Sequence, residues 1–69
     1  MIKKMNELDC VKLIKPYWKL KIGTLGYILI KYDENNFEVE FVGDNNNTLD
    51  VSAVSRDYLE LDEAYKRNN

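Results

Sequence analysis

Residues 15–21, with the sequence KPYWKLK, combine the residue types best suited to binding. Two neighbouring aromatic side chains offer large rigid surfaces that lose little conformational entropy, so they are typical anchors of protein interfaces. The lysines around them could instead contact nucleic-acid phosphates while a ring stacks on a base. A third interpretation is that an aromatic side chain here covers the open end of a small core. The candidate partner-binding residues of this segment are Tyr17, Trp18, Lys15, Lys19 and Lys21.

Glu38 and Glu40 are the second candidate group, because they share one face of a predicted strand at about 7 Å from each other. Carboxylates at that separation could seat a glycosidase pair or a calcium ion. The exterior of a small barrel is convex, however, so water would solvate both charges. Together with Asp44 and Asp50 they would form an acidic face that opposes a basic partner surface. We therefore interpret Glu38 and Glu40 as partner-binding candidates.

The remaining chemistry argues against an enzyme. The sequence contains no histidine, which removes the commonest general base and a major metal ligand. Its single cysteine, Cys10, can form neither an internal disulfide nor a thiolate zinc site, and it falls in a predicted strand, so we interpret it as a buried structural thiol. Gly23 and Gly26 lack the ending of a phosphate loop and are expected where the chain needs an unusual φ or a close backbone approach. We therefore expect no catalytic residues, no metal and no cofactor.

The clearest of the elements that must position these residues is the strand at residues 37–41. Strict alternation places Phe37, Val39 and Phe41 on one face, which is typical of a half-buried antiparallel strand. Residues 26–32 predict the preceding strand, since they are rich in aromatic and branched side chains. Its facing stays open: the inward set is Ile28, Ile30 and Tyr32, or Tyr27 and Leu29, or parts of both sets around a bulge.

Segments rich in Asn and Asp, at residues 33–36 and 43–47, predict two tight turns, because these residues tolerate positive φ and bond to their own backbone. The turns join three strands into a meander. The third strand covers residues 48–53, in which Leu49, Val51 and Ala53 alternate with polar residues.

The other segments complete a five-stranded order. Residues 9–14 predict a first strand with Val11 and Leu13 on one face, followed by a long loop to residue 25. Residues 55–58 predict a single helical or 3₁₀ turn with Ser55 as its N-cap, and residues 59–61 predict a short last strand. Strand, long loop, three-stranded meander, single turn and short strand is the order of an all-β, five-stranded SH3-like barrel.

The chain of 69 residues is long enough for one domain, in which we assign residues 6–61 to the core and residues 62–69 to a tail. Residues 1–31 carry seven lysines and two acids, whereas residues 32–69 carry three basic residues and ten acids. In a barrel both signs would mix on the solvated surface. Because no apolar run fits a signal peptide or a membrane span, we expect a cytoplasmic protein without membrane contact.

Five short segments carry a shared pattern: Asn6-Glu7-Leu8-Asp9-Cys10-Val11, Lys21-Ile22-Gly23-Thr24-Leu25-Gly26, Phe37-Glu38-Val39-Glu40-Phe41-Val42, Thr48-Leu49 and Leu59. The pattern is similar to that of a small bacterial family of domains of unknown function, over about residues 6–61. Cys10 stands where the family usually has Val, and Tyr27 where Thr is common. The resemblance implies an SH3-like barrel without an attached enzyme activity. Family members are often small separate reading frames, some beside toxin-like genes, which suggests an antitoxin or immunity role by association.

These observations favour a non-catalytic protein–protein interaction module, with an antitoxin or immunity-type partner protein as one form of it. The alternative is an RNA-binding barrel, because a Gly-x-x-Gly-x-Ile hairpin before an alternating strand is also similar to barrels of the KOW type. The sequence pI of about 5.0 argues against a nucleic acid, since nucleic-acid binders usually carry a basic field. Open end strands also leave room for a homodimer, which the sequence itself does not indicate.

Overall fold

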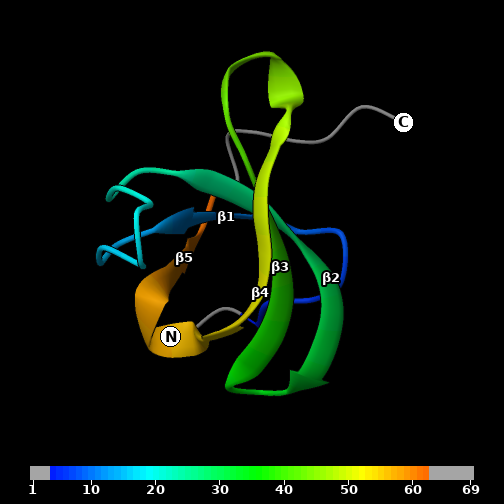
Figure 1. Cartoon of the computed structure of the whole chain (residues 1–69). Coiled ribbons are helices and arrows are strands. Elements are labelled where there is room, and N and C mark those ends of the chain that lie inside the picture. The colour runs from blue at the N-terminus through cyan, green and yellow to red at the C-terminus, as the bar shows by residue number, and fades with distance from the viewer. Residues whose placement is uncertain (1–3, 63–69) are drawn as a thin grey trace.

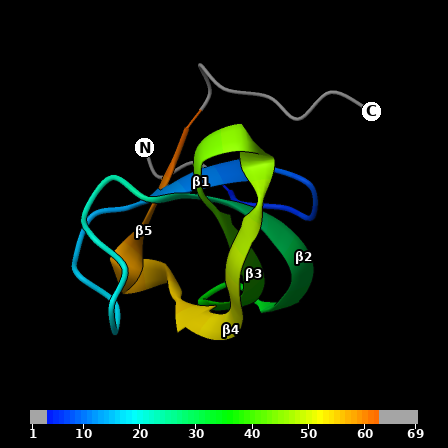
Figure 2. The ribbon, with the colours of Figure 1, turned by 45° about the horizontal axis from the view of Figure 1, so that its top comes forward.

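The computed structural model describes residues 4–62, which form five antiparallel strands in one sheet (Figure 1). The spatial order is β4-β3-β2-β1-β5, and the sheet curls around a single interior (Figure 2). This is the five-stranded SH3-like barrel that the sequence predicts. Most of the predicted tail, residues 63–69, lies outside the described residues. The elements are β1 (Cys10–Leu13), β2 (Leu25–Asp33), β3 (Asn36–Val42), η1 (Asp44–Asn46), β4 (Thr48–Ser55), η2 (Arg56–Tyr58) and β5 (Leu59–Leu61), where η denotes a 3₁₀ turn.

The main core is built on β3, as its alternation predicts. Phe37, Val39 and Phe41 are fully buried, while Glu38 and Glu40 between them are half-buried on the other face. The buried side chains of β3 pack against residues of all four other strands and against a residue that precedes β1. These partners are Met5, Val11, Leu13, Ile28, Val54 and Leu59.

A bulge in β2 separates a first part, whose side chains are buried or half-buried, from a second part, whose side chains are mostly exposed. Tyr27 and Ile28 are neighbours in the sequence, yet both are fully buried. The register with β3 shifts between Ile28 and Ile30, and beyond the shift the side chains of Leu29 and Ile30 are exposed. Ile28 therefore faces the main core, whereas Tyr27 faces the outer side of the sheet. There it forms a second small cluster with Cys10, Val42 and the half-buried Leu25.

The predicted turns form through the expected side-chain chemistry. Asp33 Oδ1 accepts a hydrogen bond from the Asn35 backbone N–H at 2.7 Å, which lowers the pKa of that carboxyl group. In η1, Asn45 and Asn46 adopt φ values of 62° and 63°, in the left-handed region that Asn tolerates. Ser55 caps η2, since its Oγ accepts from the Asp57 N–H at 3.3 Å.

Gly23 at the end of the first loop and Gly26 in β2 both occupy the kind of position that the sequence predicts for them. Gly23 has a φ of 94°, in the left-handed region, and its neighbour Thr24 donates its N–H to the Lys21 carbonyl at 3.1 Å to close a tight turn. Gly26 lies against β3, where a Cβ atom would be only 2.7 Å from Val39 Cγ1. Gly23 therefore allows a left-handed backbone conformation, and Gly26 allows β3 to approach without a side-chain clash.

The alternation of β4 is real, but its apolar set faces outward. Val51 lies opposite Glu40, and Ala53 lies opposite Glu38, so both are on the outer side of the sheet. The side chain of Val51 is accordingly exposed, while Val54 from the other set is buried. Phe41 pairs with Asp50 and Val42 pairs with Thr48, so the register shifts at this point and Leu49 is an extra residue in β4.

Candidate functional site

The first loop folds back on itself through a two-residue turn at Trp18 and Lys19. The Tyr17 N–H donates to the Leu20 carbonyl at 3.1 Å, and the Leu20 N–H donates to the Tyr17 carbonyl at 2.8 Å. Trp18 has a φ of 53°, a left-handed conformation that costs a non-glycine residue roughly 1–2 kcal/mol. Its side chain points away from the barrel and is 86% exposed. A large exposed ring on a strained backbone makes this turn a candidate binding surface.

Tyr17, rather than Trp18, covers the open end of the core. Its ring lies 6.1 Å from the Phe41 ring and 5.5 Å from the Tyr58 ring, which it meets edge-on at 82°. The Tyr17 hydroxyl donates to the Ala53 carbonyl of β4 at 3.3 Å. Trp18 in turn meets Tyr17 at a centroid distance of 6.4 Å and an angle of 87°. Tyr17 is thus held by its contacts with the core and with β4, and the exposed Trp18 indole packs edge-on against it.

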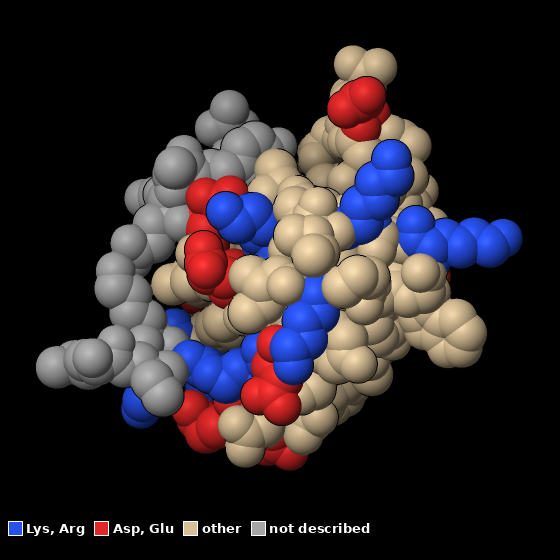
Figure 3. Space-filling view, turned by 90° about the vertical axis from the view of Figure 1, so that its left-hand side faces the viewer, with Lys and Arg blue, Asp and Glu red and all other residues tan. Residues whose placement is uncertain are grey.

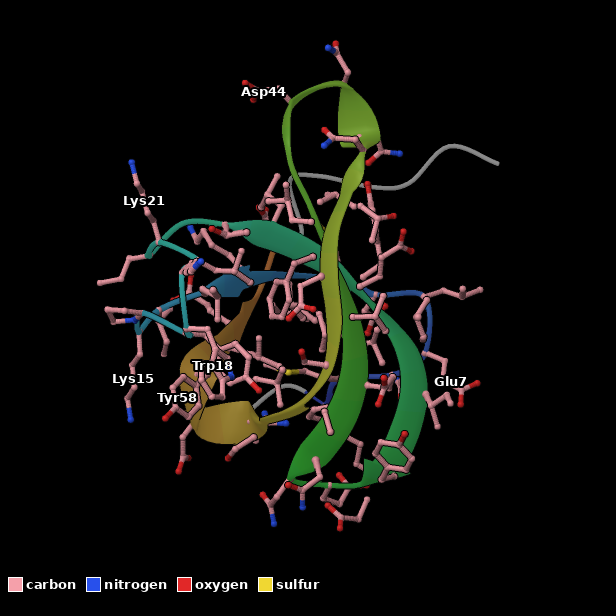
Figure 4. The ribbon with its side chains drawn as sticks, in the orientation of Figure 1. Glu7, Lys15, Trp18, Lys21, Asp44 and Tyr58 are labelled. Atoms are coloured by element: carbon pink, nitrogen blue, oxygen red, sulfur yellow. The ribbon has the colours of Figure 1, made fainter. Side chains whose placement is uncertain are left out.

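Tyr58, at the end of η2, is a site residue that the sequence analysis missed. It packs half-buried against the core and faces Tyr17. Lys15 Nζ lies 5.5 Å from the centroid of its ring, a cation–π contact of about 0.5–1 kcal/mol at exposed sites. The available signal was an aromatic residue at the end of a capped turn, directly before the last strand. Figure 4 shows Lys15, Trp18 and Tyr58 gathered where the first loop meets η2. We call Lys15, Tyr17, Trp18 and Tyr58 the aromatic cluster.

The two other lysines of the loop occupy different places. Lys19 is exposed on the turn beside Trp18. Lys21 lies farther along, on the rim of a separate shallow groove of about 390 Å³ between the Lys21–Thr24 turn and the β3–β4 connection, with Asp44 also lining it. On this side of the molecule, basic and acidic side chains are interspersed (Figure 3). Lys19 therefore lies beside the aromatic cluster, whereas Lys21 lies apart from it.

Glu38 and Glu40 lie on a different surface from the aromatic cluster. Phe41, which supports Tyr17, faces the interior, whereas Glu40 beside it faces the outer side of β3. Both carboxylates accept hydrogen bonds from neighbouring hydroxyls, Glu40 from Thr48 and Glu38 from Tyr32, the latter at 2.8 Å. The bond to Glu38 raises the pKa of Tyr32. The seven residues proposed from the sequence are thus divided among three places: the first-loop turn with the aromatic cluster, the separate groove beside Lys21, and the outer side of β3.

The described part of the chain lacks two other kinds of feature. Residues 4–62 contain no group of three or more His, Cys, Asp or Glu side chains placed to hold a metal ion. Over the same residues, no helix has the length and apolar character of a membrane span.

Comparison with known families gives a match over most of the chain. Residues 7–61 match the family model described as Domain of unknown function (DUF4926). The chain belongs to this family. The match confirms the resemblance to a family of domains of unknown function, and it spans all five strands of this DUF4926 domain as well as the whole aromatic cluster. No curated protein and no solved structure matches the chain.

Proposed function

We propose that this DUF4926 domain is a non-catalytic protein-interaction module that binds its partner through the aromatic cluster. The observation that carries the proposal is Trp18, whose indole is 86% exposed at the tip of a turn with a left-handed φ. Tyr17 orients the ring, so little conformational freedom is lost when a partner covers it. Tryptophan and tyrosine at the centre of an interface are the side chains that most often dominate its affinity.

The chemistry around the indole indicates what the partner surface would offer. Lys15 lies over Tyr58, and Lys19 stands beside Trp18 on the turn. A complementary surface would present an apolar pocket for the indole with carboxylates at its rim. We favour an antitoxin or immunity-type role in the bacterial cytoplasm, which the family resemblance supports by association with toxin-like genes.

The test is capture of the partner from the native host with the tagged full chain. Wild type, Trp18→Ala and the matched control Ile22→Ala would be compared, since Ile22 is an exposed apolar loop residue outside the aromatic cluster. The protein retained by wild type is then purified and its Kd measured. We expect Trp18→Ala to weaken binding at least about 30-fold, as for an interface hot spot, and Ile22→Ala to leave it unchanged. Equal binding by all three proteins, or no retained protein at any salt, contradicts the proposal.

Single-stranded RNA is the second candidate, because Lys15, Lys19 and Lys21 are all exposed along the loop that carries the indole. Stacking of a base on Trp18 would quench its fluorescence, and Trp18 is the only tryptophan of the chain. Three phosphate contacts predict a log–log salt dependence of about −2. Quenching with that slope, reduced in Lys19→Gln, would favour RNA. Absence of quenching, or binding that does not weaken as the salt concentration rises, would exclude RNA binding.

A further inference from the structure

Strand β4 presents a second surface, formed by one open edge. It covers eight residues, Thr48–Ser55, and pairs with β3 on one side. Within residues 4–62, no other strand pairs with its second side, because β4 ends the sheet. Residues 48–51 are all exposed. Natural edge strands are often short, bulged, or protected by lysine or proline. β4 carries no lysine or proline, and its one register shift with β3 lies near its start, so residues 50–55 pair with β3 without interruption.

The backbone groups of Val51 point toward this open edge. The Ile28 N–H donates to the Asp9 carbonyl at 3.0 Å, so Ile28 directs its hydrogen bonds away from β3. Along an antiparallel strand this direction alternates, so the preceding residue, Tyr27, bonds to its partner Glu40 in β3. The backbone N–H and C=O of Glu40 therefore point toward β2 and away from β4. Its partner in β4, Val51, directs its own N–H and C=O to the open edge.

The contact of Tyr17 supports this assignment independently. Ala53 lies two residues after Val51 and must point the same way, and its carbonyl accepts from the Tyr17 hydroxyl, which lies outside the sheet ladder. Val51 and Ala53 thus form a short row of backbone donors and acceptors along the edge. Such a row can pair with an added strand in the same way that β3 pairs with β4.

The charges of this surface indicate what kind of strand would add. The edge strand β4 carries one acidic side chain, Asp50, and no basic one. Asp50 pairs with the inward-facing Phe41, so Glu38 and Glu40 of β3 lie on the other face of the sheet. Asp50 is exposed on the edge strand itself, and the side chain of the adjacent Val51 is exposed on the opposite face of the strand. A second copy of this chain, in a register centred on Asp50, would place two carboxylates directly across from each other. Like charges in that position are destabilising.

We propose that the open edge of β4 binds an extended segment of another protein, in which basic and apolar residues alternate, by strand addition. A basic side chain opposite Asp50 would neutralise the carboxylate, and the flanking apolar side chains would cover Val51. This surface uses no residue of the aromatic cluster except the Tyr17 hydroxyl at its end. The inference goes beyond the proposed function and does not depend on the role of Trp18.

The probe for the test is a capped heptapeptide, Lys-Val-Lys-Val-Lys-Val-Lys, added to the isotope-labelled full chain. By NMR we expect the amide signals of Val51 and Ala53 to shift and their hydrogen exchange to slow, with binding that weakens as salt rises. Asp50→Asn should weaken binding by up to about fivefold, the value of one cross-strand charge pair. Asp57→Asn, an exposed aspartate on η2, is the matched control and should change nothing.

Two further peptides separate the contribution of charge from that of backbone pairing. A Glu-Val peptide of the same length tests the charge, and a Lys-Val peptide with its central amides N-methylated tests the backbone pairing; we expect neither to bind. Equal binding of either peptide, or shifts confined to the aromatic cluster, overturns the proposal. Concentration-dependent dimerisation of the protein alone, with the same two amides protected, also overturns it and identifies a second copy as the occupant.

Discussion

Replacement of Trp18 by glycine separates a binding role of the indole from a role in the core. The ring is 86% exposed, so its main loss is the edge-on contact with Tyr17, worth about 0.5–1.5 kcal/mol. Glycine relieves the left-handed φ, a gain of roughly 1–2 kcal/mol, and loosens the unfolded chain, a loss of about 0.4–1 kcal/mol. These contributions nearly cancel. We expect the free energy of unfolding to stay within about 1 kcal/mol of wild type.

The measurement is urea denaturation followed by far-UV circular dichroism, because the substitution removes the only tryptophan and with it the fluorescence signal. Tyr17→Ala is the comparison: it removes the ring that contacts both Phe41 and Tyr58, and it should cost about 2–4 kcal/mol. A loss of about 3–5 kcal/mol for Trp18→Gly, the cost of deleting a core aromatic, would refute the reasoning. The indole would then belong to the core, and the aromatic cluster would lose its claim to be a binding surface.

Three other predictions concern the barrel. Gly26→Ala should cost about 1–3 kcal/mol in urea denaturation, because the new Cβ would lie 2.7 Å from Val39 Cγ1; an unchanged midpoint would contradict the close approach. Burial raises the pKa of Cys10 from 9.0 to about 11, so the stability it contributes is complete below pH 9 and is lost as pH rises toward 11. Cys10→Ala should flatten that part of the pH profile relative to wild type, and parallel profiles would count against it. Ser55→Ala removes the cap of η2 and should cost about 0.5–1 kcal/mol, with Ser52→Ala as a control that leaves η2 capped.

The elements that sequence reasoning found are those with a strong local signal. β3 alternates without interruption, and both of its turns use residues suited to them: the Asp33 side chain closes the first, and Asn45 and Asn46 adopt left-handed φ values in the second. Gly23 and Gly26 were informative for the same reason, since each answers a local demand for conformation or space. Such signals do not depend on distant parts of the chain.

The facing of β2 and β4 could not be predicted in this way, because both strands contain a register shift. One extra residue moves every following side chain to the other side of the sheet, and no composition rule locates that residue. In β2 the shift after Ile28 places Ile30 opposite Glu38 on the outer side, although Ile28 two residues earlier faces the core. In β4 the same effect leaves Val51 exposed beside an open edge. The second surface therefore depends on pairing geometry that only the assembled sheet reveals.

The exposure of Trp18 follows from the burial of Tyr17, and this link explains why the sequence left the two residues as alternatives. The barrel needs one ring over Phe41, and the loop is too irregular for a periodic pattern to say which of two adjacent aromatics supplies it. Once Tyr17 takes that place and bonds to Leu20 across the turn, Trp18 must occupy the turn itself and point outward. A core requirement alone would be met by any small residue at Trp18, and glycine would suit its φ better. The presence of the largest side chain at the position that least favours it is the strongest reason to assign this ring to binding.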